Sequence, residues 1–184
     1  MKHYLFCIGA PWGYRVVERL RDAISCEVFD KARVETCQAI RWRTWRYVFF
    51  LNYSWLVPLH TLALMQEAVN FHATPLPFGR GGAPIENMIL RDFDSTVITA
   101  HRMIAEIDAG PIYCVSEPVS LAGTKEQILA RFVLPVTRMI KEIIALEPIP
   151  VAQSGTPVYF KRLPPDEYQR FWQARESEVS KCAS

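Results

Sequence analysis

The sequence predicts an α/β domain built on an open, mostly parallel sheet. Segments that read as buried strands alternate with segments whose apolar residues recur at helical spacing, which is the pattern of successive β-α-β units. The chain has 184 residues, of which 50% are hydrophobic and 22% charged, so it can fill one core. Its formal net charge of +2 is too small to indicate a surface for nucleic acid by itself.

The first half of the chain supplies most of the predicted strands. Tyr4–Ile8 is a continuous apolar run closed by Gly9, as in a strand buried on both faces of a parallel sheet. After it, Val16, Val17, Leu20 and Ile24 share one helical stripe. We expect further strands at Cys26–Phe29, Tyr47–Leu51 and Val69–His72, and a helix over Leu59–Ala68.

The second half begins with a Pro/Gly-dense loop at 72–84, after which Pro84 suits the first position of a short helix. Val97–His101 and Ile112–Val115 read as strands flanking a turn. A long helix follows, with one apolar stripe formed by Ile128, Phe132, Val136, Ile140 and Ile144. We expect one domain over 1–148 and a polar tail, without a domain of its own, over 149–184.

Several classes of protein are disfavoured. The five cysteines form no CxxC pair, which argues against a zinc site or a disulfide framework, and we expect no bound metal. The N-terminus lacks a signal-peptide pattern, and no apolar run reaches the ~18 residues of a membrane span. These features favour a cytoplasmic protein with no membrane partner.

The candidate chemistry lies at strand ends, where open α/β sheets place their ligand sites. Asn70 and His72 end one strand and share a face, because they are two residues apart. Asp108 sits in the turn after another predicted strand. Taken alone, Asn70 and His72 are more typical of a histidine satisfied by hydrogen bonds beside a structural amide.

The wider pattern resembles the 10-formyltetrahydrofolate-dependent formyltransferases, whose branches act on methionyl-tRNA, glycinamide ribonucleotide and aminosugars. The resemblance is carried by Asn70–Pro77, Gly81, Ala83–Ile85 and Ile107–Gly110, and it covers roughly residues 47–117. It implies a Rossmann-like sheet of the formyltransferase type, here with a shortened N-terminal half between the first helix and Tyr47.

Formyl transfer to an amine needs donors aimed at a developing oxyanion and a base for the amine's proton. Asn70 and His72 are suitable donors, and Asp108 can take the proton directly or through water. A carboxylate near His72 would also favour its imidazolium form.

The family register implies that the folate pterin binds between two loops. Those loops match Tyr53, Ser54, Trp55, Leu56 and Val57 on one side, and Ile104, Ala105, Glu106 and Ile107 on the other. Tyr53 and Trp55 could equally be core or lid aromatics. The acceptor would contact Thr74, Pro75, Arg80 and His101, although His101 reads as well as a polar residue at a strand end.

Two basic segments have open interpretations. Arg41–Arg46 interleaves arginine with tryptophan, so it could be a nucleic-acid patch, a phosphate clamp or a partly buried surface segment. Lys161 and Arg162 lie in the predicted tail, where we expect solvated side chains.

We therefore predict an N-formyltransferase that uses 10-formyltetrahydrofolate to formylate a small amine, first of all an aminosugar linked to a nucleotide. Alternatives are a glycinamide ribonucleotide formyltransferase, a formyltetrahydrofolate hydrolase, and a non-catalytic module that binds folate or a sugar nucleotide. The 36 residues after Pro148 leave little room for a tRNA-binding domain, so we expect no tRNA partner. Whether the chain forms a homodimer is left open.

Overall fold

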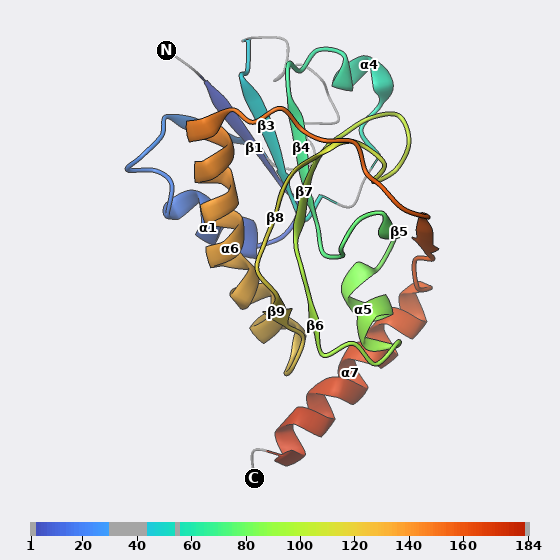
Figure 1. Cartoon of the computed structure of the whole chain (residues 1–184). Helices are drawn as coiled ribbons and strands as arrows, with labels where there is room; N and C mark the ends of the chain where they lie inside the picture. Colours follow the sequence, from blue (N-terminus) through green and yellow to red (C-terminus); the bar gives the residue numbers. More distant parts are fainter. Residues whose placement is uncertain (1–2, 30–43, 54–55, 183–184) are drawn as a thin grey trace.

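A computed structural model describes residues 3–29, 44–53 and 56–182 (Figure 1). Among these residues, six strands form the central sheet in the order β2-β1-β3-β4-β7-β8. β2, β1, β3 and β4 are mutually parallel, whereas β7 runs antiparallel to both β4 and β8. The strands are β1 (Tyr4–Ile8), β2 (Cys26–Phe29), β3 (Tyr47–Leu51), β4 (Ala68–His72), β7 (Thr99–Arg102) and β8 (Ile112–Val115). The predicted mixed α/β fold with a mostly parallel sheet is confirmed.

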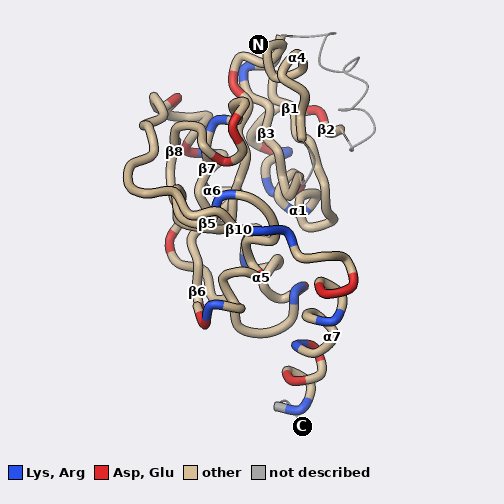
Figure 2. The backbone as a smooth tube through the Cα atoms, turned by 90° about the vertical axis from the view of Figure 1, so that its right-hand side faces the viewer, with Lys and Arg blue, Asp and Glu red and all other residues tan. Residues whose placement is uncertain are grey.

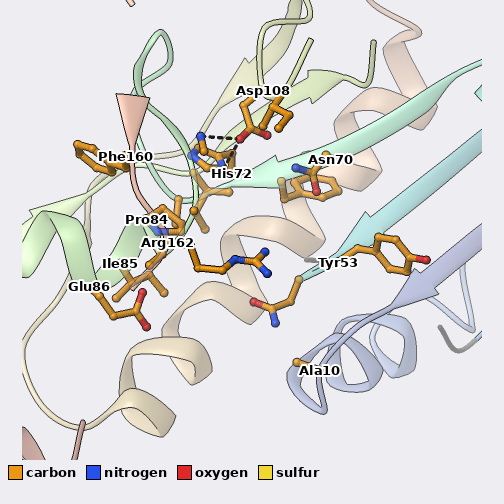
Figure 3. A pocket seen from close by; sticks show the side chains of 18 of the residues that line it. Ala10, Tyr53, Asn70, His72, Pro84, Ile85, Glu86, Asp108, Phe160 and Arg162 are labelled. Atoms are coloured by element: carbon orange, nitrogen blue, oxygen red, sulfur yellow. Dashed lines mark hydrogen bonds and ion pairs between the residues drawn. The ribbon is translucent and has the colours of Figure 1, made fainter. Parts of the chain in front are cut away.

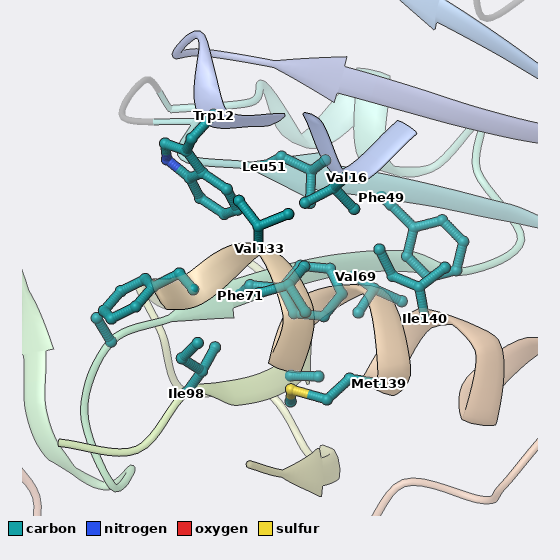
Figure 4. Close-up of a cluster of buried hydrophobic side chains, with 14 of the residues drawn as sticks. Trp12, Val16, Phe49, Leu51, Val69, Phe71, Ile98, Val133, Met139 and Ile140 are labelled. Atoms are coloured by element: carbon teal, nitrogen blue, oxygen red, sulfur yellow. The ribbon is translucent and has the colours of Figure 1, made fainter. Parts of the chain in front are cut away.

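The sheet is buried on both faces, which explains why its strands read as unbroken apolar runs. Phe6 and Phe49 face a large cluster covered by the helices α1 (Trp12–Glu18) and α6 (Lys125–Leu146) (Figures 1 and 4). Their strand neighbours point the other way, into a second cluster with Trp45. Alternate residues along a strand face opposite sides of the sheet, so each strand needs apolar side chains at every position.

Helix α6 provides the largest cover of the sheet. It begins with a capping box at Thr124, whose hydroxyl accepts a hydrogen bond from the backbone N–H of Gln127. Ile128, Phe132, Val136 and Ile140 are all buried against the sheet, as the stripe predicts.

Two predicted helices are longer than those observed. The expected helix over Leu59–Ala68 is only α4 (Leu59–Leu62), because Leu59 and Leu64 are 61% and 43% exposed and bury no continuous stripe. The chain must also extend at once, since the carbonyl of Glu67 already accepts from Val48 on β3. The first helix likewise ends at Glu18 instead of continuing to Ile24.

The segment beyond Pro148 contains two elements that the sequence analysis missed. β10 (Val158–Phe160) pairs in parallel with β5 (Phe78–Gly81), which lies inside the predicted loop and leads into α5 (Pro84–Ile89). α7 (Pro165–Cys182) follows, and the short strands β6 (Ser95–Thr96) and β9 (Val119–Ser120) pair nearby. The C-terminal segment therefore packs on the elements that follow His72.

α7 docks through one buried side chain and then extends away from the sheet (Figure 1). Trp172 is 5% exposed, and its indole N–H donates to Oε1 of buried Glu86 on α5 at 2.8 Å. The rest of α7 carries closely spaced charges of both signs (Figure 2). Within the described ranges, no helix has the length and apolarity needed to cross a membrane.

We expect Trp172→Phe to lower the free energy of unfolding by about 1–3 kcal/mol, because a buried oxygen of Glu86 loses its donor while most packing is kept. Urea unfolding measures this change. Glu178→Gln, at an exposed position of the same helix, leaves this hydrogen bond unchanged and serves as the control. A loss in Trp172→Phe no larger than in Glu178→Gln would contradict a docking role for the hydrogen bond.

Candidate active site

A cavity of about 1680 Å³ opens where β4 ends against the loop between β7 and β8 and the turn between β5 and α5 (Figure 3). Asn70, His72, His101 and Asp108 line it together. The volume exceeds the ~1,000 Å³ upper range of sites for one small ligand. The cavity can therefore hold a donor and an acceptor together.

Asp108 is the centre of the polar cluster in this cavity. Its Oδ1 lies 3.3 Å from Nε2 of His101, and its Oδ2 lies 3.6 Å from Nδ1 of His72. Oδ2 also accepts a hydrogen bond of 2.9 Å from the backbone N–H of Gly81. The carboxylate thus joins three segments: the end of β4, strand β7 and the end of β5.

These contacts keep Asp108 ionised although it is largely buried. Burial is the largest influence and by itself would raise the pKa of the carboxyl group. The hydrogen bond from His101, the charges of His72 and His101 and the N–H of Gly81 together outweigh it and lower the pKa of Asp108 to about 2. Asp108 is therefore an anion at every physiological pH.

His72 differs from the sequence-based expectation. Its Nε2 donates to the carbonyl of Gly79 at 2.7 Å, which leaves Nδ1 facing Asp108. Burial is the largest influence and lowers the pKa of His72, although Asp108 and the Gly79 carbonyl oppose this change. Asp108 therefore favours the imidazolium form of His72, as expected, but burial has the larger effect and lowers the pKa of His72 below its ordinary value.

Asn70 and His101 are cross-strand partners, since β4 pairs with β7 in the register Asn70↔His101. Nδ2 of Asn70 lies 3.3 Å from Nε2 of His101. Nδ1 of His101 lies 3.0 Å from the carbonyl of Arg102, which can only accept, so this nitrogen carries a proton. The structure thus makes His101 part of the cluster and not merely a polar residue at a strand end.

Apolar side chains line the cavity on the side of the predicted pterin loops. Leu56 and Ile107 are 79% and 50% exposed although they lie at the cavity, and Val57 and Ile104 lie with them. Tyr53, Ala105 and Glu106 complete this wall. Tyr53 also packs edge-on against the core residue Phe50. It therefore contacts the core and lines the cavity at the same time. Ser54 and Trp55 lie outside the described residues.

Curated relatives cover much of this chain. No protein-family profile matches. A methionyl-tRNA formyltransferase from Acidothermus cellulolyticus is 28% identical over 155 residues, which are 80% of this chain and 48% of that protein. One from Thermobifida fusca is 35% identical over 105 residues, 54% of this chain and 34% of that protein. The solved methionyl-tRNA formyltransferase from Clostridium thermocellum has a TM-score of 0.80 at 27% identity, covering 91% of this chain and 75% of that one. In sequence and in fold, the chain is therefore similar to the methionyl-tRNA formyltransferases.

A solved structure with lower sequence identity shares the fold. PseJ from Anoxybacillus kamchatkensis, a formyltransferase solved with a UDP-linked formamido sugar and tetrahydrofolate, has a TM-score of 0.69 at 15% identity. The alignment covers 96% of this chain and 97% of that one. By contrast, this chain spans less than half the length of the curated methionyl-tRNA formyltransferases named above.

The relatives correct one expectation about partners. The exclusion of tRNA conflicts with sequence relatives that are methionyl-tRNA formyltransferases. That exclusion was based on the short segment after Pro148. These relatives match the chain over only part of their own length, so chain length cannot decide the acceptor.

Three of the residues predicted to contact the acceptor lie outside the cavity lining. Thr74 is fully buried, and its hydroxyl donates to the carbonyl of Gly79, so it shapes the loop. Pro75 is exposed away from the cavity, and Arg80 is engaged by Gln153, Glu106 and Tyr159. In the structure Thr74 and Arg80 make contacts within the chain, and none of the three residues lines the cavity.

Two cavity residues had no usable sequence signal as site residues. Arg162 is exposed, as expected of a solvated residue, but it lines the cavity and points into it beside Glu86 (Figure 3). Glu86 comes from α5, where the apolar pattern of the helix gave no indication of a buried carboxylate.

In the basic segment Arg41–Arg46, residues 41–43 lie outside the described residues. Arg46 pairs with Glu147 at 3.3 Å and lies over the ring of Tyr47, so this end makes contacts within the chain.

The contacts of Asp108 predict a pH-dependent contribution to stability. The folded pKa of about 2 lies below the unfolded value, so the contribution is complete above the unfolded pKa of ~3.9 and is lost as pH falls towards 2. We expect the stability difference between wild type and Asp108→Asn to decrease by about 2 kcal/mol between ~pH 5 and ~pH 2. Urea unfolding across this range measures it, with the exposed Asp166→Asn as control. A difference that does not change with pH would contradict the electrostatic account.

Proposed function

We propose that this chain carries the catalytic site of an N-formyltransferase, which moves a formyl group from 10-formyltetrahydrofolate to a primary amine. The observation that carries the proposal is the cluster around Asp108, where His72 and His101 lie within 3.6 Å of one carboxylate beside Asn70. This cluster faces a cavity with an apolar wall on one side. The similarity to methionyl-tRNA formyltransferases supports the same chemistry.

The residues of the cluster fit the two needs of the reaction. As the amine nitrogen bonds to the formyl carbon, the formyl oxygen gains negative charge, and the carboxamide N–H of Asn70 is a donor for it. The amine must also lose a proton, which the Nδ1 lone pair of His72 can accept facing Asp108. The bond between the folate nitrogen and the formyl carbon then breaks, and the proton passes to that nitrogen.

The wall formed by Tyr53, Leu56, Val57 and residues 104–107 fits a flat heteroaromatic ring. Exposed apolar side chains gathered at a cavity are the typical lining of such sites. Neighbours solved with tetrahydrofolate or with folinic acid support a folate co-substrate. When bound, this co-substrate supplies the activated formyl group.

Two acceptor classes have separate support. The curated relatives favour the α-amine of methionyl-tRNA. A nucleotide-linked aminosugar, the acceptor we expected first, is favoured by neighbours solved with a UDP-linked formamido sugar and with dTDP-3-aminofucose. The two classes use the same amine chemistry at Asn70, His72 and Asp108.

A panel of acceptors tests the activity. Purified protein is mixed with 10-formyltetrahydrofolate and, separately, with methionyl-tRNA, aminosugar nucleotides or glycinamide ribonucleotide, and loss of the formyl cofactor is followed. We expect loss that depends on one acceptor class. Formate release without any acceptor would instead indicate a hydrolase. Folate binding without turnover on any acceptor would indicate a non-catalytic module.

With the acceptor found in that panel, we expect Asp108→Asn to lower kcat by about 10²–10⁴-fold. Folate binding should persist, because an asparagine carbonyl can still accept from the N–H of Gly81. Steady-state kinetics and folate titration measure the two effects, and Asp166→Asn controls for a lost surface carboxylate. Retained turnover in Asp108→Asn would remove Asp108 from the proposed site.

A further inference from the structure

Gln153 lies in the C-terminal segment between Pro148 and β10, outside every strand and helix. This segment, orange-red in Figure 1, runs beside the loop between β7 and β8 that carries Asp108. Its first contact is a two-way backbone bridge between Val151 and Ile112, with hydrogen bonds of 2.7 and 2.8 Å. Val151 precedes Gln153 by two residues, and Ile112 follows Asp108 by four. The bridge therefore holds the segment of Gln153 close to the loop of Asp108.

All the polar atoms of the Gln153 carboxamide are used. Its Nε2 donates to the carbonyl of Asp108 at 2.7 Å and to the carbonyl of Gly110 at 2.8 Å. Its Oε1 accepts from Nε and Nη2 of Arg80 at 3.1 and 2.8 Å. Backbone carbonyls only accept and a guanidinium only donates, so the amide has one orientation that satisfies all four contacts.

The backbone that Gln153 holds is strained. Asp108 has a φ of +51°, in the left-handed region that side-chain-bearing residues seldom occupy. Such a conformation persists only where its surroundings fix it, and it is common at functional sites. At Asp108, Gln153 fixes the carbonyl, while the N–H of Gly81 fixes the carboxylate.

We propose that Gln153 is a positioning residue of the formyl-transfer site, which holds the main chain at Asp108 so that the carboxylate points at His72 and His101. This inference rests on the proposed function. Gln153 does not line the cavity. Its effect on the transfer step is exerted through Asp108.

The other half of the amide has a separable role. Buried Arg80 also donates to Oε1 of Glu106 at 2.9 Å, and Glu106 belongs to the predicted pterin wall. The amide oxygen of Gln153 therefore supports the folate side through Arg80, while its N–H₂ group supports Asp108. Two substitutions can separate these roles.

Gln153→Glu keeps an acceptor for Arg80 but cannot donate to the carbonyls of Asp108 and Gly110. We expect its kcat to fall by about tenfold or more, with the KM for 10-formyltetrahydrofolate unchanged. Gln153→Met, which is similar in size, loses both sets of contacts, so kcat should fall and this KM should rise. Gln173→Met, on the exposed face of α7, is the matched control. Wild-type kcat in Gln153→Glu would overturn the positioning role.

A second readout does not require activity. The chain has four histidines, so NMR can follow their ring titrations individually. His72 is faced by Asp108, which raises its pKa, and by His101, which lowers it, while burial is the largest influence and also lowers it. If Gln153→Met displaces Asp108, His72 should titrate at still lower pH than in wild type. An unchanged titration would overturn the proposal even if the panel of acceptors had shown no formyl transfer.

Discussion

The buried Asp108 carboxylate is the interaction on which the site depends. It is the one group that contacts the end of β4, strand β7 and the turn after β5 within the described cluster. A buried charge is tolerated only when its partners replace the lost water. The two histidines and the Gly81 N–H are these partners, so the fold must bring three distant segments together before the carboxylate is stable.

The direction of β7 makes this arrangement possible. Because β7 runs antiparallel to β4, His101 lies directly opposite Asn70, and the chain leaving β7 turns back over the end of the sheet. In this register the end of β7 lies opposite Val69 at the start of β4, so the β7–β8 loop must fold back to bring Asp108 to His72. The single reversal in an otherwise parallel sheet therefore places His101 beside Asn70, and the fold of the loop completes the cluster.

The sequence was informative where a pattern has one physical meaning. Buried strands such as Tyr47–Leu51 need apolar residues at every position, and the Asn70-x-His72 spacing with Asp108 after a later strand located the cluster. Arg80 and Thr74 lie outside the cavity lining, because residue spacing does not show which way the loop after His72 and strand β5 turn their side chains. Gln153 and β10 had no signal, since a three-residue strand and one glutamine in a polar segment have no periodicity. The charge of His72 depended on burial, which only the fold determines.

The low pKa of Asp108 limits what this carboxylate can do in the proposed reaction. A group with a pKa of about 2 holds a proton only about one time in 10⁵ at neutral pH, so it is a weak base by itself. Nδ1 of His72 faces this carboxylate, and the other ring nitrogen of His72 already donates to the Gly79 carbonyl. We therefore infer that His72 receives the amine's proton and that Asp108 stabilises the resulting imidazolium, because a carboxylate beside an imidazole favours its charged form.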